Sequence, residues 1–131
     1  MKSKVILSFG SNCGMREEQL CAAISFCHEF FYNIAVSSIY ETPEVHGQGD
    51  PYLNAVMRGE TDLTEEELSK VLKDYEYSSG RDEEARRKGF VPIDIDIVKW
   101  EDRIIRPWDY DQEFFRIGYR EVLKRLSNNQ S

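Results

Sequence analysis

The segment Ile93-Asp94-Ile95-Asp96-Ile97 has the most regular alternation of residue types in the sequence. Strict alternation of apolar and acidic residues predicts a β-strand, because successive side chains of a strand point to opposite faces. The isoleucines would face the core, and both aspartates would share the other face with Cα atoms about 6.5–7 Å apart. Two like charges there repel unless a cation neutralises them, and hard carboxylate oxygens suit Mg²⁺. The alternative is a solvated polar face on an edge strand.

Outward from this strand, apolar periodicity divides the chain into strands and helices. Strands are predicted at 5–9, 34–41, 52–60 and 93–98, and helices at about 15–31, 64–77 and 111–126. The second helix begins with a capping box, Thr64 with Glu67 three residues later. The order strand, helix, strand, strand, helix, strand is typical of the split βαβ or ferredoxin-like plan. We expect an α+β fold with helices on one face of an antiparallel sheet, as a single domain over residues 1–131.

A basic loop precedes the acidic strand. Between residues 80 and 89 it holds four cations within eight residues of an otherwise acidic chain, namely Arg81, Arg86, Arg87 and Lys88. Phosphate transfer needs positive charge where negative charge develops, and the glycines at both ends would let the loop close over a substrate. The alternative is a solvated surface loop, because neighbouring acidic residues dilute its charge.

A third feature is the pair of segments that flank the 42–51 loop. Thr42-Pro43 follows one predicted strand and Tyr52-Leu53-Asn54 begins the next, so the two segments could frame a pocket. Tyr52 offers a stacking surface, and Asn54 offers both a donor and an acceptor to the edge of a heterocycle. A proline-fixed hairpin with a satisfied asparagine is the alternative. Gly10-Ser11-Asn12, after the first strand, is a common turn sequence and a weaker signal.

Composition narrows the possible functions. The formal net charge of −7 argues against a nucleic-acid binder with a basic face. Three cysteines without a C-x-x-C pair indicate free thiols in a reducing compartment, with Cys21 and Cys27 packed or half-packed in the first helix. The apolar run near the N-terminus is too short for a signal peptide or a membrane span. We expect a cytoplasmic protein that binds neither nucleic acid nor membranes, with no metal-ligand role for His28 or His46.

These motifs occur in the order and spacing of one family, from Val5 to about Pro107. They are Gly10-Ser11-Asn12, Tyr40 with Thr42-Pro43, Tyr52-Leu53-Asn54-Ala55-Val56, Glu76, Gly80-Arg81 and Ile93-Asp94-Ile95-Asp96-Ile97. The chain resembles the 6-hydroxymethyl-7,8-dihydropterin pyrophosphokinase family of folate biosynthesis. The resemblance implies a ferredoxin-like core and an ATP- and Mg²⁺-dependent diphosphokinase. Such an enzyme moves the β,γ-pyrophosphoryl group of ATP to the hydroxymethyl oxygen of the pterin and releases AMP.

The same resemblance implies roles for individual residues. Asp94 and Asp96 would hold two Mg²⁺ ions, and together with Arg81 they would form the catalytic set. Arg81 would bind the ATP phosphates, Glu76 would bind the nucleotide, and Ile97 would contact its base. The pterin pocket would be lined by Thr42, Pro43, Tyr52 and Asn54.

Two other hypotheses stay open. The family usually has an aromatic residue where Lys88 stands and an arginine where Val91 stands. A catalytically degenerate relative that binds nucleotide or pterin without turnover would fit these differences. A third reading is a related pyrophosphoryl transfer onto another small alcohol.

Overall fold

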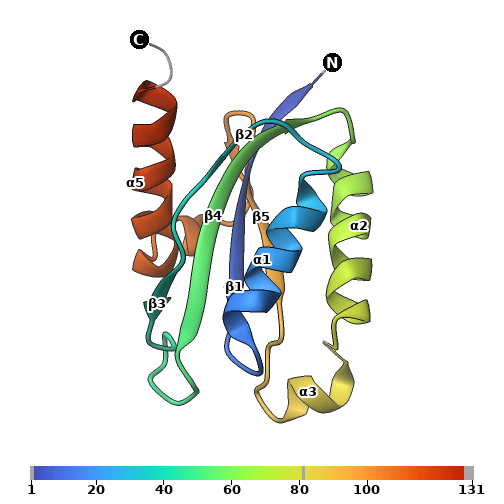
Figure 1. Cartoon of the computed structure of the whole chain (residues 1–131), viewed down its shortest axis with the longest axis vertical. Coiled ribbons are helices and arrows are strands. Elements are labelled where there is room, and N and C mark those ends of the chain that lie inside the picture. Colours follow the sequence, from blue (N-terminus) through green and yellow to red (C-terminus); the bar gives the residue numbers. More distant parts are fainter. Residues whose placement is uncertain (1, 81, 129–131) are drawn as a thin grey trace.

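A six-stranded antiparallel sheet forms the centre of the computed structural model, which describes residues 2–80 and 82–128 (Figure 1). The strands lie in the order β2-β4-β1-β5-β6, and β3 pairs with the first residues of β4. They are β1 (Ser3–Ser11), β2 (Tyr32–Val36), β3 (Tyr40–Thr42), β4 (Tyr52–Thr61), β5 (Asp94–Trp100) and β6 (Arg103–Ile104). The order of β2, β4, β1 and β5 is that of the split βαβ plan, so the predicted α+β, ferredoxin-like fold is confirmed.

Helices cover both faces of this sheet. They are α1 (Arg16–Cys27), α2 (Glu65–Ser78), α3 (Glu83–Arg87), α4 (Pro107–Tyr110) and α5 (Glu113–Asn128). α1 and α2 lie together on one face, and α5 lies on the other (Figure 1). The expectation that the helices share one face is therefore wrong for α5. Among the described residues, no helix combines the length and apolar content that crossing a membrane requires.

The strands are apolar on both faces, which explains the second helical layer. In β4, Ala55 and Met57 belong to the larger core under α1 and α2, whereas Val56 belongs to a smaller core under α5. Successive strand residues point to opposite faces, so a strand that is apolar at each position needs cover on both sides. α5 supplies this cover with the face that its spacing predicted, namely Phe115, Tyr119, Val122 and Leu126.

The strand predicted over 34–41 is divided in two. β2 ends at Val36 and β3 begins at Tyr40. At the break, the N–H of Ser37 donates to the carbonyl of Val56, and the N–H of Val56 donates to Ser37 Oγ, both at 2.9 Å. A side-chain oxygen thus replaces a backbone carbonyl as hydrogen-bond partner. The apolar pattern of the sequence does not reveal this change of hydrogen-bond acceptor.

The end of the first helix and the stretch before β5 also differ from the prediction. α1 ends at Cys27 rather than near Phe31, although Phe31 is buried in the larger core as expected. The stretch 81–91, predicted as a loop, contains α3. Asp82 caps this helix, because its Oδ1 accepts a hydrogen bond from the N–H of Ala85 at 2.8 Å.

α2 begins as its sequence predicts. Thr64 Oγ1 accepts a hydrogen bond from the N–H of Glu67 at 3.1 Å, and Glu67 Oε1 accepts one from the N–H of Thr64 at 2.9 Å. This reciprocal pair is the predicted capping box. The helix then buries Leu68 and Leu72 in the larger core.

The three cysteines are free thiols, as predicted. Cys27 is buried, and burial raises the pKa of its thiol to about 12, so this cysteine is protonated at neutral pH. Cys21 is exposed rather than packed. It follows the buried Leu20 on α1 and therefore points away from the core.

Candidate active site

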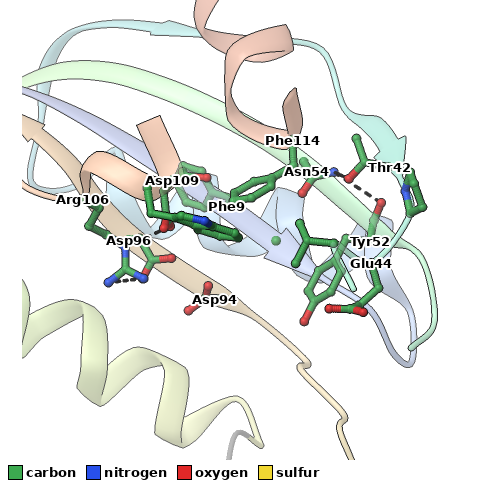
Figure 2. Close-up of a pocket in the computed structure, with 15 residues that line it drawn as sticks. Phe9, Thr42, Glu44, Tyr52, Asn54, Asp94, Asp96, Arg106, Asp109 and Phe114 are labelled. Carbon is green, nitrogen blue, oxygen red and sulfur yellow. Dashed lines mark hydrogen bonds and ion pairs between the residues drawn. The ribbon is translucent and has the colours of Figure 1, made fainter. Parts of the chain in front are cut away.

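Asp94 and Asp96 share one face of β5. Ile93 and Ile95 are buried in the larger core and Ile97 packs against it, so the isoleucines face α1 and α2 as their alternation predicts. The aspartates project from the opposite face, and both line the same cavity. Figure 2 shows the two side chains along β5.

β5 is an edge strand over the residues that carry the aspartates. β1 pairs with it on one side, but β6 pairs only with Lys99 and Trp100 on the other. Within the part of the chain that the structure describes, residues 94–97 have no strand partner on that second side. Glu76 of α2 reaches this edge, where its Oε2 accepts a hydrogen bond from the N–H of Ile95 at 2.6 Å. The open edge leaves room for a second cavity beside α2.

The first cavity, of about 260 Å³, lies on the α5 face of the sheet. All four residues predicted to bind a pterin line it: Thr42, Pro43, Tyr52 and Asn54. The cavity also contains two aromatic residues that the sequence patterns did not reveal, Trp108 of α4 and Phe114 of α5, with ring centroids 6.1 Å apart. The one sequence feature that could have predicted α4 is Pro107, because proline is common at the first position of a helix. Flat apolar surface with few polar groups suits a planar heterocycle.

Asn54 has a defined orientation in the wall of the first cavity. It is only 3% exposed, and its Nδ2 donates a hydrogen bond to Thr42 Oγ1 at 2.8 Å (Figure 2). Each hydrogen bond described for the Asn54 side chain uses Nδ2. Its Oδ1 is therefore the atom that can accept a hydrogen bond from a ligand.

The second cavity, of about 610 Å³, lies at the open edge of β5 beside α2. Glu76 and Ile97, both predicted to bind nucleotide, line it. Lys73 of α2 and Arg86 of α3 add positive charge to its wall. Arg81 lies outside the described residues, so its role stays a prediction.

Asn12 anchors the segment that joins α3 to β5. Its Oδ1 accepts a hydrogen bond from the N–H of Val91 at 2.6 Å, and its Nδ2 donates to the carbonyl of Gly89 at 3.0 Å. The backbone N–H of Asn12 also donates to the carbonyl of Val91 at 2.9 Å. The turn after the first strand, a weak signal in the sequence, therefore holds the chain as it approaches Asp94.

Among the described residues, three line both cavities: Asp94, Asp96 and Arg106. Arg106 Nη1 lies 3.9 Å from Asp96 Oδ1, and Arg106 Nε donates a hydrogen bond to Asp109 Oδ2 at 3.0 Å. Neither Arg106 nor Asp109 was a candidate from the sequence. The two cavities thus meet at two carboxylates and one guanidinium, and Asp109, which holds the guanidinium, lines the first cavity alone.

The charges at this junction favour a bound cation. Burial first, and the Asp94 carboxylate second, raise the pKa of Asp96 to about 9, although Arg106 acts in the opposite direction. No group of three or more His, Cys, Asp or Glu side chains in residues 2–80 and 82–128 is placed to hold a metal ion. A carboxylate pair still fits Mg²⁺, which proteins commonly bind through one or two carboxylates together with waters and substrate phosphates.

Comparison with known proteins identifies the family. Residues 6–124 match the family model of 7,8-dihydro-6-hydroxymethylpterin-pyrophosphokinase (HPPK). The chain belongs to the HPPK family. The match confirms the resemblance carried by the sequence motifs and extends it past Pro107 into α5.

Individual relatives in the HPPK family agree with this assignment. The chain is 39% identical over 99 residues to "Folate synthesis bifunctional protein" of Arabidopsis thaliana, an alignment that covers 72% of this chain and 20% of the relative. It is 36% identical over 104 residues to "2-amino-4-hydroxy-6-hydroxymethyldihydropteridine pyrophosphokinase" of Aquifex aeolicus, covering 78% and 64% of the two chains. It is 34% identical over 128 residues to "Folic acid synthesis protein fol1" of Schizosaccharomyces pombe, covering 95% and 17%. The chain therefore spans less than two thirds of each of these HPPK relatives.

Proposed function

We propose that this chain is an ATP- and Mg²⁺-dependent diphosphokinase of folate biosynthesis. It transfers pyrophosphate to the hydroxymethyl group of 6-hydroxymethyl-7,8-dihydropterin and releases AMP. One observation carries the proposal: two cavities with different linings meet at Asp94, Asp96 and Arg106. Membership of the HPPK family supports it, as does the name of the Aquifex aeolicus relative. The free thiols are typical of a reducing compartment, which supports a cytoplasmic location.

The reaction needs no covalent intermediate with the protein. The hydroxymethyl oxygen forms a bond to the β-phosphorus of ATP, while the bond between that phosphorus and the oxygen bridging to the α-phosphorus breaks. AMP leaves with the bridging oxygen and its electron pair, and the hydroxyl proton passes to solvent. The protein then has to position both substrates and compensate charge.

The first cavity holds the pterin in this proposal. The planar ring stacks against aromatic side chains of the cavity wall, namely Tyr52, Trp108 and Phe114. Asn54 accepts a hydrogen bond from the ring edge through Oδ1, and Thr42 keeps the Asn54 amide in place. Binding in this orientation directs the hydroxymethyl group toward the aspartates at the junction.

The second cavity holds the nucleotide. Lys73 and Arg86 offer positive charge to the phosphates. Ile97 offers apolar surface to the base. Asp94 and Asp96 hold Mg²⁺, which when bound neutralises negative charge on the phosphate chain.

An assay of AMP release tests the proposal. The purified chain is supplied with ATP, Mg²⁺ and the pterin alcohol, and we expect AMP to form only when all three are present. Asp96→Ala should lower the rate by about 100-fold or more, because a metal-binding carboxylate is lost from the junction. Asp102→Ala is the matched control, since Asp102 is exposed in the turn after β5 and lines neither cavity.

Three outcomes contradict the proposal. AMP release without the pterin would indicate simple hydrolysis of ATP. Release that depends on a different alcohol would identify another acceptor. Calorimetric binding of ATP and pterin with no AMP formed would identify a binding protein without turnover.

A further inference from the structure

Arg106 occupies the boundary between the two cavities. It lies between β6 and α4, and its side chain is 47% exposed. Figure 2 shows its guanidinium beside Asp96, at the end of the first cavity away from Tyr52 and Glu44. The other described cations of the site, Lys73 and Arg86, line the second cavity alone. Arg106 is therefore the described cation that reaches both substrates' cavities.

Asp109 fixes the direction of this guanidinium. The Asp109 side chain is buried, with 7% of the residue exposed, and it accepts a hydrogen bond from Arg106 Nε at 3.0 Å. The Nη1 atom lies 3.9 Å from Asp96 Oδ1. That distance makes an ion pair and is too long for a hydrogen bond. The terminal nitrogens of Arg106 thus lie at the junction, and their N–H groups are not used in a hydrogen bond to Asp96.

A phosphate group is the ligand that this arrangement suits. A guanidinium is planar, permanently charged and able to donate two parallel hydrogen bonds to phosphate oxygens. Hydrogen bonding through Nε to a buried carboxylate limits the rotation of the side chain, so less conformational entropy is lost when a ligand binds. The aspartate pair would repel a bare anion even when it shares a proton, so binding at this place requires Mg²⁺ as well as Arg106.

We propose that Arg106, positioned by Asp109, binds the phosphates of the nucleotide that lie where the two cavities meet. The inference rests on the proposed function, because it takes the nucleotide to occupy the second cavity. Arg106 contacts the pyrophosphoryl group that moves between the substrates. Asp109 acts only through Arg106 and is a positioning residue.

Calorimetric titration with α,β-methylene-ATP and Mg²⁺ tests the inference, because this analogue has no oxygen at the bond that breaks. Arg106→Gln should weaken analogue binding by about tenfold or more. AMP binding should change by less than about twofold, because AMP lacks the β- and γ-phosphates. Arg106→Lys, which keeps the charge but not the planar donor pair, should recover part of the lost analogue affinity.

A double-mutant cycle tests the positioning role of Asp109. Asp109→Asn should weaken analogue binding when Arg106 is present and should have no further effect in the Arg106→Gln background. A merely structural role for Asp109 would instead lower affinity equally in both backgrounds. Arg120→Gln is the control, because Arg120 pairs with Glu113 on α5 at 3.2 Å and lines neither cavity.

The outcomes separate this inference from the proposed function. If the wild-type chain binds neither the analogue nor AMP, both are overturned. If the wild-type chain binds the analogue and Arg106→Gln binds it equally well, the inference alone is overturned. Equal losses of analogue and AMP affinity in Arg106→Gln would also overturn it, because they would indicate a disturbed cavity rather than a lost phosphate contact.

Discussion

The hydroxyl of Tyr40 on β3 donates a hydrogen bond to the carbonyl of Phe114 on α5 at 2.5 Å. The same hydroxyl accepts one from the N–H of Gly118 at 3.1 Å. It therefore lies between two backbone groups that pair directly in an uninterrupted α-helix. Burial raises the pKa of Tyr40 to about 12, so this hydroxyl keeps its proton at physiological pH. Tyr40 thus joins the strand that carries Thr42 to the helix that carries Phe114.

Tyr40→Phe should lower the free energy of unfolding by about 1–2 kcal/mol, because two backbone groups of α5 lose a buried partner. Urea unfolding measures this change. We also expect weaker pterin binding, because Thr42 and Phe114 line the first cavity from the two elements that Tyr40 connects. Wild-type stability in Tyr40→Phe would show that α5 closes its own hydrogen bond without cost.

Gly118→Ala should be more disruptive than an alanine at an exposed position of α5. A Cβ at residue 118 would lie 2.6 Å from Val56 Cγ2 and 2.8 Å from Tyr40 Oη, so α5 would have to move away from the sheet. Overpacking of this kind costs about 1–3 kcal/mol. Thermal unfolding of Gly118→Ala against Arg120→Ala, at an exposed position of the same helix, measures the difference. Equal melting temperatures would refute the close packing of α5 on β4.

Asp96→Asn should stabilise the protein when Mg²⁺ is removed with a chelator. Burial, and then Asp94, raise the pKa of Asp96 from 3.8 to about 9. The folded state therefore retains a proton that the unfolded state releases, and this group lowers the free energy of unfolding as pH rises from about 4 to about 9. Asparagine does not ionise, so Asp96→Asn avoids this fall in the free energy of unfolding. An increase of only 1 kcal/mol in the free energy of unfolding corresponds to about 4 °C in Tm.

Thermal unfolding of wild type and Asp96→Asn in chelator, at about pH 5 and about pH 8, checks the sign of this effect. The difference in Tm should be larger at the higher pH. At about pH 8 the Asp96 carboxyl has lost its proton in the unfolded wild type but keeps it in the folded wild type, and this difference favours unfolding. Mg²⁺ should raise the Tm of the wild type and have less effect on Asp96→Asn. An equal difference at the two pH values would contradict the assigned pKa shift.

Asn54→Ala should weaken pterin binding by about tenfold or more while leaving affinity for the ATP analogue unchanged. The reason is that Asn54 lines the first cavity and not the second. Thr42→Val should have a smaller effect, because it removes the acceptor for Asn54 Nδ2 but leaves Oδ1 in place. Fluorescence titration with the pterin alcohol measures both variants. Equal losses in the two variants would contradict the role assigned to Oδ1.

Glu76→Ala should destabilise the fold by about 1–3 kcal/mol, because the N–H of Ile95 loses its acceptor at the open edge of β5. Glu76→Gln keeps an oxygen that can accept from the same N–H and should cost less. Urea unfolding of the two variants separates them. If both variants keep wild-type stability, the hydrogen bond between Glu76 and Ile95 does not stabilise β5.

Short-range patterns predicted the parts of the site that lie within one element. The alternation over 93–97 placed Asp94 and Asp96 on one face, because strand geometry repeats every second residue. The capping box predicted the start of α2 because it also depends on neighbouring residues: Thr64 and Glu67 are three residues apart. The apolar spacing of α5 likewise predicted its buried face. The break at Ser37 escaped prediction because its partner, Val56, lies in another strand.

The sequence by itself therefore determined the order of the main strands and helices, the pairing of the two aspartates on one face and the residue types available to bind phosphate and a heterocycle. Only the tertiary structure decided that α5 covers the second face, that Glu76 meets the edge of β5, and that Arg106 and Asp109 stand beside Asp96. The physical reason is that periodicity acts over a few neighbouring residues. Contacts between separate elements depend instead on how the chain turns back and on which surfaces remain to be buried.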